Sequence, residues 1–509
     1  MVNQSLWKKM RRAFVFAALG LVALWLNMAA PVWAMPQAPE RAAQTAPQAV
    51  TARTGAASVF GIDDGGVISS GETTRNLAVG TGANWERISL YWSSLEPTQG
   101  NYNFTSADNA LTPLLNKGFS LYVYLEMNPT WASNTNCGPV NGADKVAAFA
   151  TMLGKLAQRY PAVKVWSAYN EVDFEGNVSQ NNGGCFGASS AGGVNNNGVK
   201  DASEYAQMMA AAWKAIHAAN PNALFSMGAV AYDNFNASSA PAGYPGGGNG
   251  GIFNYKFLSD LFTYMKNNPL SNGGKYMDLM AFNFYNIYGP YWQTKASGYG
   301  IQAKAKVLRN LMSAKSIPVV PLFVTETGED SIWLGANGQA RCLTMTMVRG
   351  AGTNLMGVTW WTFKDFPDSA PAPRNTWKYG VVDQNLVPKP AYTAFSVIAN
   401  ELNGFNYDKT MTNKTNFKGV EAYSFVNGGA KKIVMWGFSK PNPTDPDKPE
   451  CSWARASNLA NFNATTVRTV TYLGAVKTIK DNSTKDKNPA VGVIGLYAGG
   501  NPMIVQINP

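Results

Sequence analysis

The chain has 509 residues, of which 46% are hydrophobic, 12% aromatic and 14% charged. This length exceeds that of one ordinary domain, and the apolar and aromatic content excludes an intrinsically disordered protein. Because His217 is the only histidine, zinc sites built from several imidazoles are excluded, and a histidine-dependent triad would have to use that one residue. His217 lies in the amphipathic stretch AAWKAIHAANPN, which predicts a helix-surface histidine, so we expect carboxylates to carry any catalysis.

Residues 1–34 have the layout of a secretory signal peptide. Four basic residues at positions 8–12 precede an apolar stretch at 13–26, and VWA at 32–34 fits a cleavage site. The alternative is an uncleaved membrane anchor, because the apolar stretch approaches spanning length. Cleavage would lower the net charge from +11 to about +7, leaving 38 basic against 31 acidic residues. With no basic run elsewhere, no nucleic-acid partner is expected, and no membrane partner after cleavage.

Residues 35–57 are rich in Ala, Pro, Gln and Thr and predict a flexible linker. From 58 to 400, eight apolar strand candidates alternate with helical patterns, such as those at 143–159, 203–219, 255–267 and 302–314. The strand candidates are 59–63, 85–92, 119–127, 163–171, 223–231, 277–285, 320–326 and 357–363. This alternation predicts an α/β fold with a parallel sheet covered by helices, and eight units favour a (β/α)₈ TIM barrel. A doubly wound open sheet is the alternative.

Residues 401–509 lack helical periodicity. Short apolar runs such as VEAYSFVNG, KKIVMWGFSK and TTVRTVTYLG are separated by Gly, Asn, Pro and Asp. This pattern predicts a C-terminal antiparallel β-sandwich, which forms an accessory domain packed against the barrel.

The four cysteines form an even set, and an exported chain would oxidise them to disulfides. Three pairings are possible. Cys137 and Cys185 follow strands three and four, whose loops are neighbours in a barrel, so we expect them to pair. Cys342 and Cys451 would then link the barrel to the C-terminal region, unless Cys342 is a buried free thiol.

Polar residues end several otherwise apolar strands. Arg87 lies in strand two, Glu126 ends strand three, and YNE at 169–171, NFY at 283–285 and TET at 325–327 follow at strands four, six and seven. The carboxyl ends of barrel strands form the active face, and buried ionisable groups are costly unless partnered. These residues therefore predict an active site.

Two of these residues, Glu171 and Glu326, suit hydrolysis of a glycosidic bond, which needs one protonated carboxyl and one carboxylate. Strands four and seven face each other across a barrel, and a retaining mechanism requires a carboxyl separation of about 5–5.5 Å. Mutual repulsion would raise one pKa, while Arg87 and the Tyr285 hydroxyl would hold the other group ionised. The alternative is that each glutamate caps the following helix.

The motifs at these strand ends resemble those of the clan A retaining glycoside hydrolases, most closely families 39 and 5. NE after strand four and ETG after strand seven carry the resemblance. WERISLYWSSLEPTQGNYNF is similar to their strand-two signature, LEMNPTWAS to their strand-three Pro-x-Trp, and VTWWTFKD to their strand-eight Trp. The resemblance covers about 59–400, and the C-terminal strands resemble the β-sandwich often appended in these families.

The resemblance implies a role for each matching residue. Glu171 would be the general acid/base and Glu326 the nucleophile. Asn170 would bind the sugar 2-hydroxyl, while Tyr285 and Arg87 would position Glu326.

Aromatic and amide residues would complete the substrate site. Trp361 would floor the subsite at the scissile bond, and Trp131 would stack on a sugar face. The resembled families often carry His-x-Tyr on strand six, and Asn283 replaces that histidine here. Asn283 can still bind a hydroxyl but does not titrate near neutrality. Glu96 and Glu126 are secondary candidates for catalysis.

The sequence thus predicts a secreted retaining glycoside hydrolase that cleaves a β-linked poly- or oligosaccharide. Neither a metal nor an organic cofactor is implied, since two carboxyl groups suffice for the chemistry. A non-catalytic, lectin-like carbohydrate-binding protein and a transglycosylase on the same barrel are the alternatives. The sequence specifies neither the sugar nor the oligomeric state.

Overall fold

The computed structural model describes residues 58–63, 67–175, 185–188, 197–232, 253–289, 292, 298–370, 376–437, 451 and 457–509. The signal peptide and linker predicted for 1–57 lie outside these residues. Within the described part of the chain, no helix combines the length and the apolar character needed to cross a membrane.

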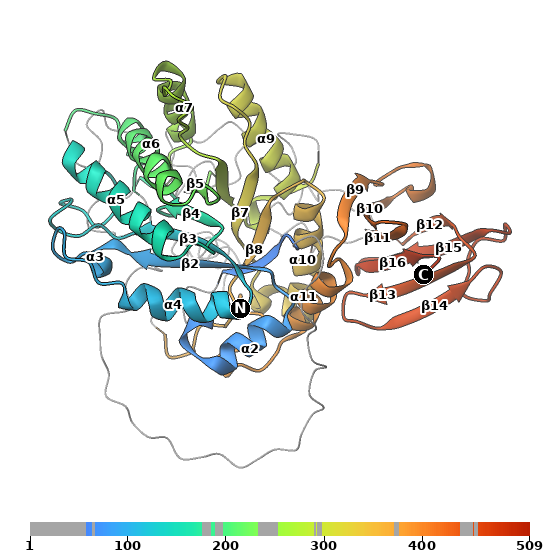
Figure 1. The fold of residues 1–509 in the computed structure, drawn as a ribbon. Helices are drawn as coiled ribbons and strands as arrows, with labels where there is room; N and C mark the ends of the chain where they lie inside the picture. Colours follow the sequence, from blue (N-terminus) through green and yellow to red (C-terminus); the bar gives the residue numbers. More distant parts are fainter. Residues whose placement is uncertain are drawn as a thin grey trace, which may run out of the picture.

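Eight parallel strands close into a barrel in chain order (Figure 1). They are β1 (Phe60–Asp63), β2 (Trp85–Tyr91), β3 (Ser120–Glu126), β4 (Val165–Ala168), β5 (Leu224–Val230), β6 (Leu279–Asn283), β7 (Leu322–Thr327) and β8 (Gly357–Trp361). All eight predicted strands are confirmed. The alternative of an open doubly wound sheet is wrong, because β1 pairs in parallel with β8 and closes the barrel.

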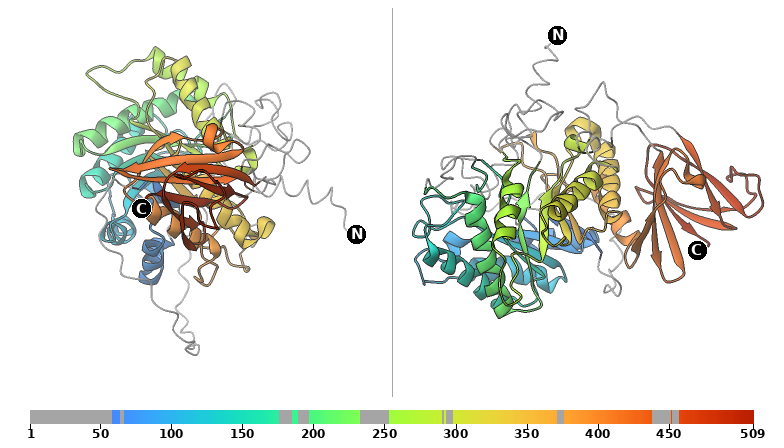
Figure 2. Two further views of the ribbon diagram at one scale, coloured as in Figure 1. Left: turned by 90° about the vertical axis from the view of Figure 1, so that its right-hand side faces the viewer. Right: turned by 90° about the horizontal axis from the view of Figure 1, so that it is seen from above.

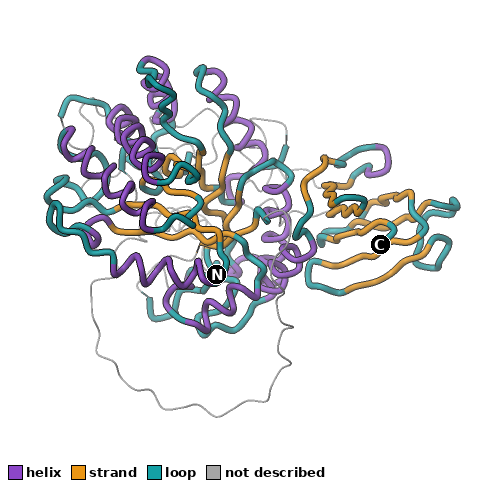
Figure 3. The backbone as a smooth tube through the Cα atoms, viewed as in Figure 1, coloured by secondary structure: helices purple, strands orange, loops and turns teal. Residues whose placement is uncertain are grey.

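Helices surround this barrel, as the colouring in Figure 3 shows. They are α2 (Glu72–Gly80), α3 (Trp92–Leu95), α4 (Thr105–Asn116), α5 (Ala143–Arg159), α6 (Asp201–Ala219), α7 (Phe257–Asn267), α9 (Gly300–Ala314), α10 (Ser331–Ala351) and α11 (Pro390–Glu401), with short 3₁₀ turns η1 (Ile68–Ser70) and η2 (Asn286–Tyr288). Helix α5 illustrates why the helices could be predicted from the sequence. Its apolar residues recur at helical spacing and are buried, as for Phe149, Met152, Leu153 and Leu156.

The strands are apolar on both faces because the barrel has an inner and an outer packing layer. Trp85, Tyr122, Tyr124 and Phe323 belong to one apolar cluster built from alternate strand residues. The rings of Trp85 and Phe323 meet edge to face with centroids 5.2 Å apart. The barrel interior is therefore a packed core, and substrate-sized space is left only at its ends.

The C-terminal region forms two antiparallel sheets. Its strands are β9 (Asn406–Thr410), β10 (Val420–Asn427), β11 (Ala430–Gly437), β12 (Asn458–Asn463), β13 (Thr466–Thr471), β14 (Val476–Lys480), β15 (Val493–Ala498) and β16 (Met503–Ile507), with the turn η4 (Thr415–Phe417). The larger sheet has the order β14-β13-β16-β11-β10-β9, and β12 pairs with β15. Ala422, Val505, Phe462 and Ile494 join the two sheets in one core, which confirms the predicted β-sandwich.

This β-sandwich lies against α10 and α11, on the side of the barrel shown in Figure 2. Arg349 of α10 is buried and donates to the buried Glu421 of β10, with Nε 2.7 Å from Oε1 and Nη2 3.0 Å from Oε2. The Trp436 indole and the Tyr423 hydroxyl also donate to Glu421, each over 2.8 Å. The interface is therefore held by a buried ion pair whose carboxylate is fully hydrogen-bonded.

Candidate active site

The carboxyl ends of the barrel strands bring most of the predicted site residues into one network of hydrogen bonds, ring contacts and strand pairs. Arg87 lies in β2 and points to β1, β4 and β7. Its Nη1 donates to Asp63 and, over 2.7 Å, to Oε1 of Glu326, while Nη2 lies 2.7 Å from Oδ1 of Asn170. Arg87 is only 1% exposed, so Asp63 and Glu326 are paired with a buried cation.

Burial lowers the pKa of Arg87, but the neighbouring carboxylates and tyrosines raise it by more. The carboxylates of Asp63 and Glu326 hold the Arg87 pKa well above its ordinary value. The guanidinium also lies over the Tyr124 ring, 4.2 Å from the centroid. Arg87 is therefore a fixed cation beneath the site.

Glu326 lies in β7 and accepts hydrogen bonds at both oxygens. Oε1 accepts from Arg87, and Oε2 lies 3.1 Å from the hydroxyl of Tyr285, which follows β6. Burial, and then the charge of Glu326, raise the pKa of Tyr285 well above its ordinary value, so this hydroxyl stays protonated and donates. Both oxygens of Glu326 are therefore held by fixed donors.

Gly328, two residues after Glu326, explains the last letter of the ETG motif. A Cβ at this position would lie 2.4 Å from the carbonyl oxygen of Trp361 and 3.0 Å from the Tyr379 ring. Only glycine lets the chain leaving β7 pass this close to the end of β8.

Glu171 follows β4 in an unusual backbone conformation. Strand β4 ends at Ala168, and Tyr169 and Glu171 have φ values of 64° and 46°. Side chains rarely adopt this left-handed region, and such outliers persist only where the surroundings enforce them. Gly228 of β5 allows the turn, because a Cβ there would lie 2.3 Å from the Ala168 oxygen and 2.8 Å from the Tyr169 oxygen.

Asn283, the last residue of β6, hydrogen-bonds Glu171 and the strand that carries Glu326. Its Nδ2 donates to Oε1 of Glu171 over 3.1 Å, and its Oδ1 accepts from Thr325 over 2.7 Å. Asn283 is also the register partner of Glu326 across the β6–β7 pair. Lys304 of α9 holds the Asn283 backbone, with Nζ 2.7 Å from its carbonyl oxygen. The amide therefore sits between Glu171 and the strand that carries Glu326.

The two glutamates have different electrostatic environments. Burial, followed by the negative charge of Glu326, raises the pKa of Glu171 well above its ordinary value. The Asn283 hydrogen bond and Arg87 oppose this effect without cancelling it. The raised pKa makes Glu171 the carboxyl of the pair suited to carry a proton, while Arg87 and Tyr285 both donate to Glu326.

Trp361 ends β8 within a cluster of aromatic rings. Its centroid lies 5.2 Å from Tyr379, 5.8 Å from Phe366, 5.9 Å from Trp377 and 6.5 Å from Tyr285. The Tyr285 contact joins this cluster to Glu326. The arrangement offers flat apolar faces beside the carboxylates.

Trp131 is the one predicted site residue that the described contacts do not bring to this network. Its indole donates to the Glu96 carbonyl oxygen over 2.8 Å and meets Trp92 edge to face, with centroids 5.2 Å apart. Glu96 itself accepts from the Trp92 indole and from the Gly100 amide. These residues form a hydrogen-bonded cluster that begins directly after the end of β2.

Two functional candidates were missed from the sequence. Asp63 ends β1 opposite Arg87 in the β1–β2 register and is paired with it. Asp173 accepts from the Ala231 and Tyr232 amides at the end of β5, and burial raises its pKa to about 7. Asp63 could have been found from the sequence, because it is a polar residue at the end of the apolar first strand. The sequence pattern contains no feature that distinguishes Asp173.

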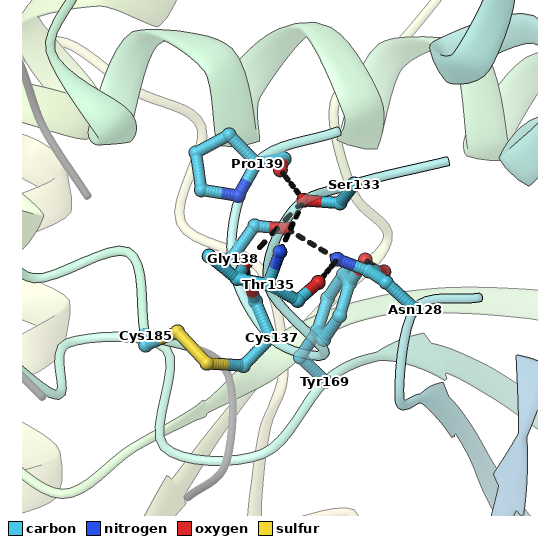
Figure 4. Close-up of a disulfide and its surroundings, with 8 residues drawn as sticks. All are labelled: Asn128, Ser133, Thr135, Cys137, Gly138, Pro139, Tyr169 and Cys185. Carbon is cyan, nitrogen blue, oxygen red and sulfur yellow. Dashed lines mark hydrogen bonds between the residues drawn. A yellow bond between two sulfur atoms is a disulfide. The ribbon is translucent and has the colours of Figure 1, made fainter. Parts of the chain in front are cut away.

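The loop after β3 is tied to the loop after β4 by the disulfide Cys137–Cys185, with Cα atoms 5.5 Å apart (Figure 4). Asn128 donates to the carbonyl oxygens of Thr135 and Gly138, and its Oδ1 accepts from the Tyr169 hydroxyl over 2.5 Å. The braced loop therefore reaches the left-handed turn that carries Glu171.

The second disulfide, Cys342–Cys451, joins α10 to the C-terminal region, so Cys342 is not a free thiol. Both pairings are those expected from the sequence. Glu329 lies near these sulfurs and completes the one group of potential metal ligands in the described residues, but the disulfide occupies both sulfur atoms.

Comparison with known proteins relates the chain to carbohydrate-active enzymes through structure. No protein-family model matches the sequence, and no curated protein matches it. A family 39 glycoside hydrolase from Bacteroides cellulosilyticus WH2 is 16% identical with a TM-score of 0.60, over 88% of this chain and 81% of that one. A family 30 endoxylanase from Clostridium papyrosolvens C71 is 14% identical with a TM-score of 0.55, over 90% and 98%. A family 39 β-xylosidase from Caulobacter crescentus is 13% identical with a TM-score of 0.55, also over 90% and 98%.

These likenesses extend over both the barrel and the C-terminal β-sandwich. At the level of fold, the resemblance that the strand-end motifs predicted is confirmed. The chain shares its fold with glycoside hydrolases of families 39 and 30.

Proposed function

We propose that the protein is a retaining glycoside hydrolase that cleaves β-glycosidic bonds in a poly- or oligosaccharide. The observation that carries the proposal is the opposed environment of two carboxyls at the active face. Arg87 and Tyr285 donate to Glu326, whereas burial and the charge of Glu326 raise the pKa of Glu171 well above its ordinary value. A glycosidase needs this division between an acid and a nucleophile.

The reaction proceeds by double displacement. Glu326 attacks the anomeric carbon while Glu171 gives its proton to the leaving oxygen, which produces a glycosyl-enzyme ester and a free alcohol. Glu171, now ionised, takes a proton from water, which attacks the anomeric carbon and releases Glu326. Formation of the ester removes the charge of Glu326, which lowers the pKa of Glu171 and suits it to act as the base.

The neighbouring residues supply orientation and binding. Because Oδ1 of Asn170 accepts from Arg87, its Nδ2 is the atom that donates to a sugar hydroxyl. Asn283 orients Glu171 through a 3.1 Å hydrogen bond. Trp361 and its aromatic neighbours pack against the apolar face of a sugar ring.

The chain organisation fits an exported enzyme. We assign residues 1–34 to a cleaved signal peptide, 35–57 to a linker, 58–400 to the catalytic barrel and 401–509 to the accessory β-sandwich. Two disulfides are consistent with an oxidising compartment. The related structures named as a xylanase and a β-xylosidase make β-xylosides the first substrates to assay.

The decisive experiment uses Glu326→Ala and Glu171→Ala with an activated aryl β-glycoside, with and without azide. Glu326→Ala is expected to lose turnover and to form the α-glycosyl azide when azide replaces the nucleophile. Glu171→Ala is expected to lose about 10²- to 10⁴-fold on poorly activated substrates and to form the β-glycosyl azide. NMR of the products separates the two roles.

The controls distinguish the competing functions. Wild-type-like turnover by Glu326→Ala would remove the nucleophile assignment. A wild-type protein that binds glycans without cleaving them would be a lectin-like protein. Transfer of the sugar to added acceptors in place of water would identify a transglycosylase.

A further inference from the structure

A third carboxyl, Glu126, lies at the active face and takes no part in the proposed mechanism. Tyr122, Tyr124 and Glu126 alternate along β3, so they point to the same side of the strand. The two tyrosines belong to the cluster that fills the barrel interior. Glu126 therefore ends this inward-facing row at the mouth of the barrel.

The carboxyl of Glu126 is buried but makes no hydrogen bond within the described part of the chain. The residue is 5% exposed, and the described part of the chain gives its side chain no hydrogen bond. Neither of its oxygens is among the fully enclosed atoms, so both remain in contact with solvent space. Arg87, the cation whose charge acts on Glu126, already donates to Asp63, Glu326 and Asn170.

Glu96 provides an instructive contrast in the same part of the barrel. It is 1% exposed, and both of its oxygens are satisfied, one by the Trp92 indole and one by the Gly100 amide. Glu96 thus has a structural role. Glu126 has no such partners, and it does not cap a helix, because α5 begins only at Ala143.

Retaining an unpaired carboxyl in this position costs stability. Burial raises the pKa of Glu126 to about 7. The charge of Arg87 lowers this pKa, and the charges of Glu326 and Asp63 raise it. A buried polar group without a protein partner is costly, and such groups gather where a ligand completes the hydrogen bonding. The charges of Arg87, Glu326 and Asp63 all act on the Glu126 carboxyl, which places Glu126 at the same end of the barrel as the Arg87–Glu326 pair.

We propose that Glu126 binds the substrate directly, by hydrogen bonding to an O–H or N–H donor of the sugar held beside Glu326. This inference rests on the proposed glycosidase function. It makes Glu126 a residue that selects among sugars by the presence of a donor at one ring position. That donor is either a hydroxyl or the ammonium group of an amino sugar.

The test compares Glu126→Ala and the isosteric Glu126→Gln in the full-length protein. The probes are 4-nitrophenyl β-glycosides: the xyloside, glucoside, galactoside, 2-amino-2-deoxyglucoside and monodeoxy forms of the best substrate. Hydrogen bonds to charged groups contribute about 1.5–3 kcal/mol, so Glu126→Ala should lose about 10- to 150-fold in kcat/KM on the best substrate. On the deoxy form that lacks the partner, wild type and Glu126→Ala should be equal.

The two variants also identify the donor. If the partner is a hydroxyl, Glu126→Gln retains part of the activity, because an amide still accepts. If the partner is an ammonium, Glu126→Gln loses as much as Glu126→Ala, and the aminoglucoside is the preferred substrate. Glu96→Gln is the control: it should lower thermal stability without changing relative rates among the glycosides.

Three outcomes count against the inference. Equal kcat/KM of wild type and both variants on every glycoside would overturn it and leave the proposed function intact. So would a uniform loss that persists on every deoxy substrate, because that pattern indicates a structural role. A wild-type protein that hydrolyses none of the panel would overturn the proposed function and this inference together. Should Glu126→Ala fail to fold, Glu126→Gln supplies the comparison.

Discussion

Replacing Arg87 by lysine tests the site more directly than any other conservative change. Nη1 serves Asp63 and Glu326, and Nη2 serves Asn170. Lysine keeps the charge but places it on one nitrogen at the end of a flexible chain. At least one of the three hydrogen bonds must therefore be lost.

The size of the effect follows from these contacts. A hydrogen bond to a charged group contributes about 1.5–3 kcal/mol, and each 1.36 kcal/mol corresponds to a tenfold rate change. We expect Arg87→Lys to lower kcat/KM by about 10- to 150-fold. Arg87→Met should also lower the free energy of unfolding by about 3–5 kcal/mol, because Asp63 and Glu326 lose their buried cation.

The assay measures kcat/KM on an aryl β-glycoside and urea unfolding for each variant. Arg75→Lys is the matched control, because Arg75 pairs with Glu72, whose side chain is 59% exposed. That control should keep full activity and lose less than about 1 kcal/mol of stability. If Arg87→Lys stays within threefold of wild type, the role given to the guanidinium is wrong.

Four further predictions follow from the described contacts. The activity of wild type should fall as pH rises through the raised pKa of Glu171, because the general acid loses its proton. Glu171→Gln should not show this fall at high pH on an activated substrate. A fall that persists in the variant contradicts the general acid/base role of Glu171. In the unfolded chain Glu171 loses its proton above pH 4.5, its ordinary pKa, whereas in the folded protein its raised pKa opposes that loss. Wild type therefore becomes less stable relative to Glu171→Gln as pH rises above this value. Urea unfolding of both proteins at pH 4 and pH 7 measures the difference. Glu421→Leu should cost about 3–5 kcal/mol because it removes the buried carboxylate to which Arg349 donates, whereas adding Arg349→Met should restore part of the loss; equal losses in urea unfolding would argue against a buried pair. Tyr169→Phe removes the 2.5 Å bond to Asn128 and should lower kcat more than it raises KM, since it loosens the turn that carries Glu171; a change in thermal midpoint without a change in kcat would show a purely structural role.

The barrel was predictable because each strand is an apolar run covered on both faces, and the gaps between runs carry helical periodicity. Helix α5 was predicted with its observed bounds for this reason. Strand β4 was predicted to reach Glu171 but ends at Ala168. The polypeptide turns there because Gly228 of the next strand leaves space for it, and hydrophobic patterning carries no information on such a contact.

The site was only partly predictable for a related reason. Glu171, Glu326 and Arg87 stood out as polar residues in apolar strands. The role of Asp63 was not predicted, because its pairing with Arg87 depends on the register between β1 and β2. Trp131 matched a motif, yet its indole is directed to the Glu96 carbonyl, a contact that only the folded loop defines.

The buried interface between α10 and the β-sandwich limits how the protein can be divided. Tyr423 and Trp436 of the β-sandwich share one apolar cluster with Leu343 and Val348 of α10, and Gly352 lies so close to Tyr423 that a Cβ would approach its ring to 2.6 Å. A fragment ending near residue 400 would expose this surface. We therefore expect the C-terminal region to contribute to the stability of the barrel, and engineered variants of this protein should keep the two together.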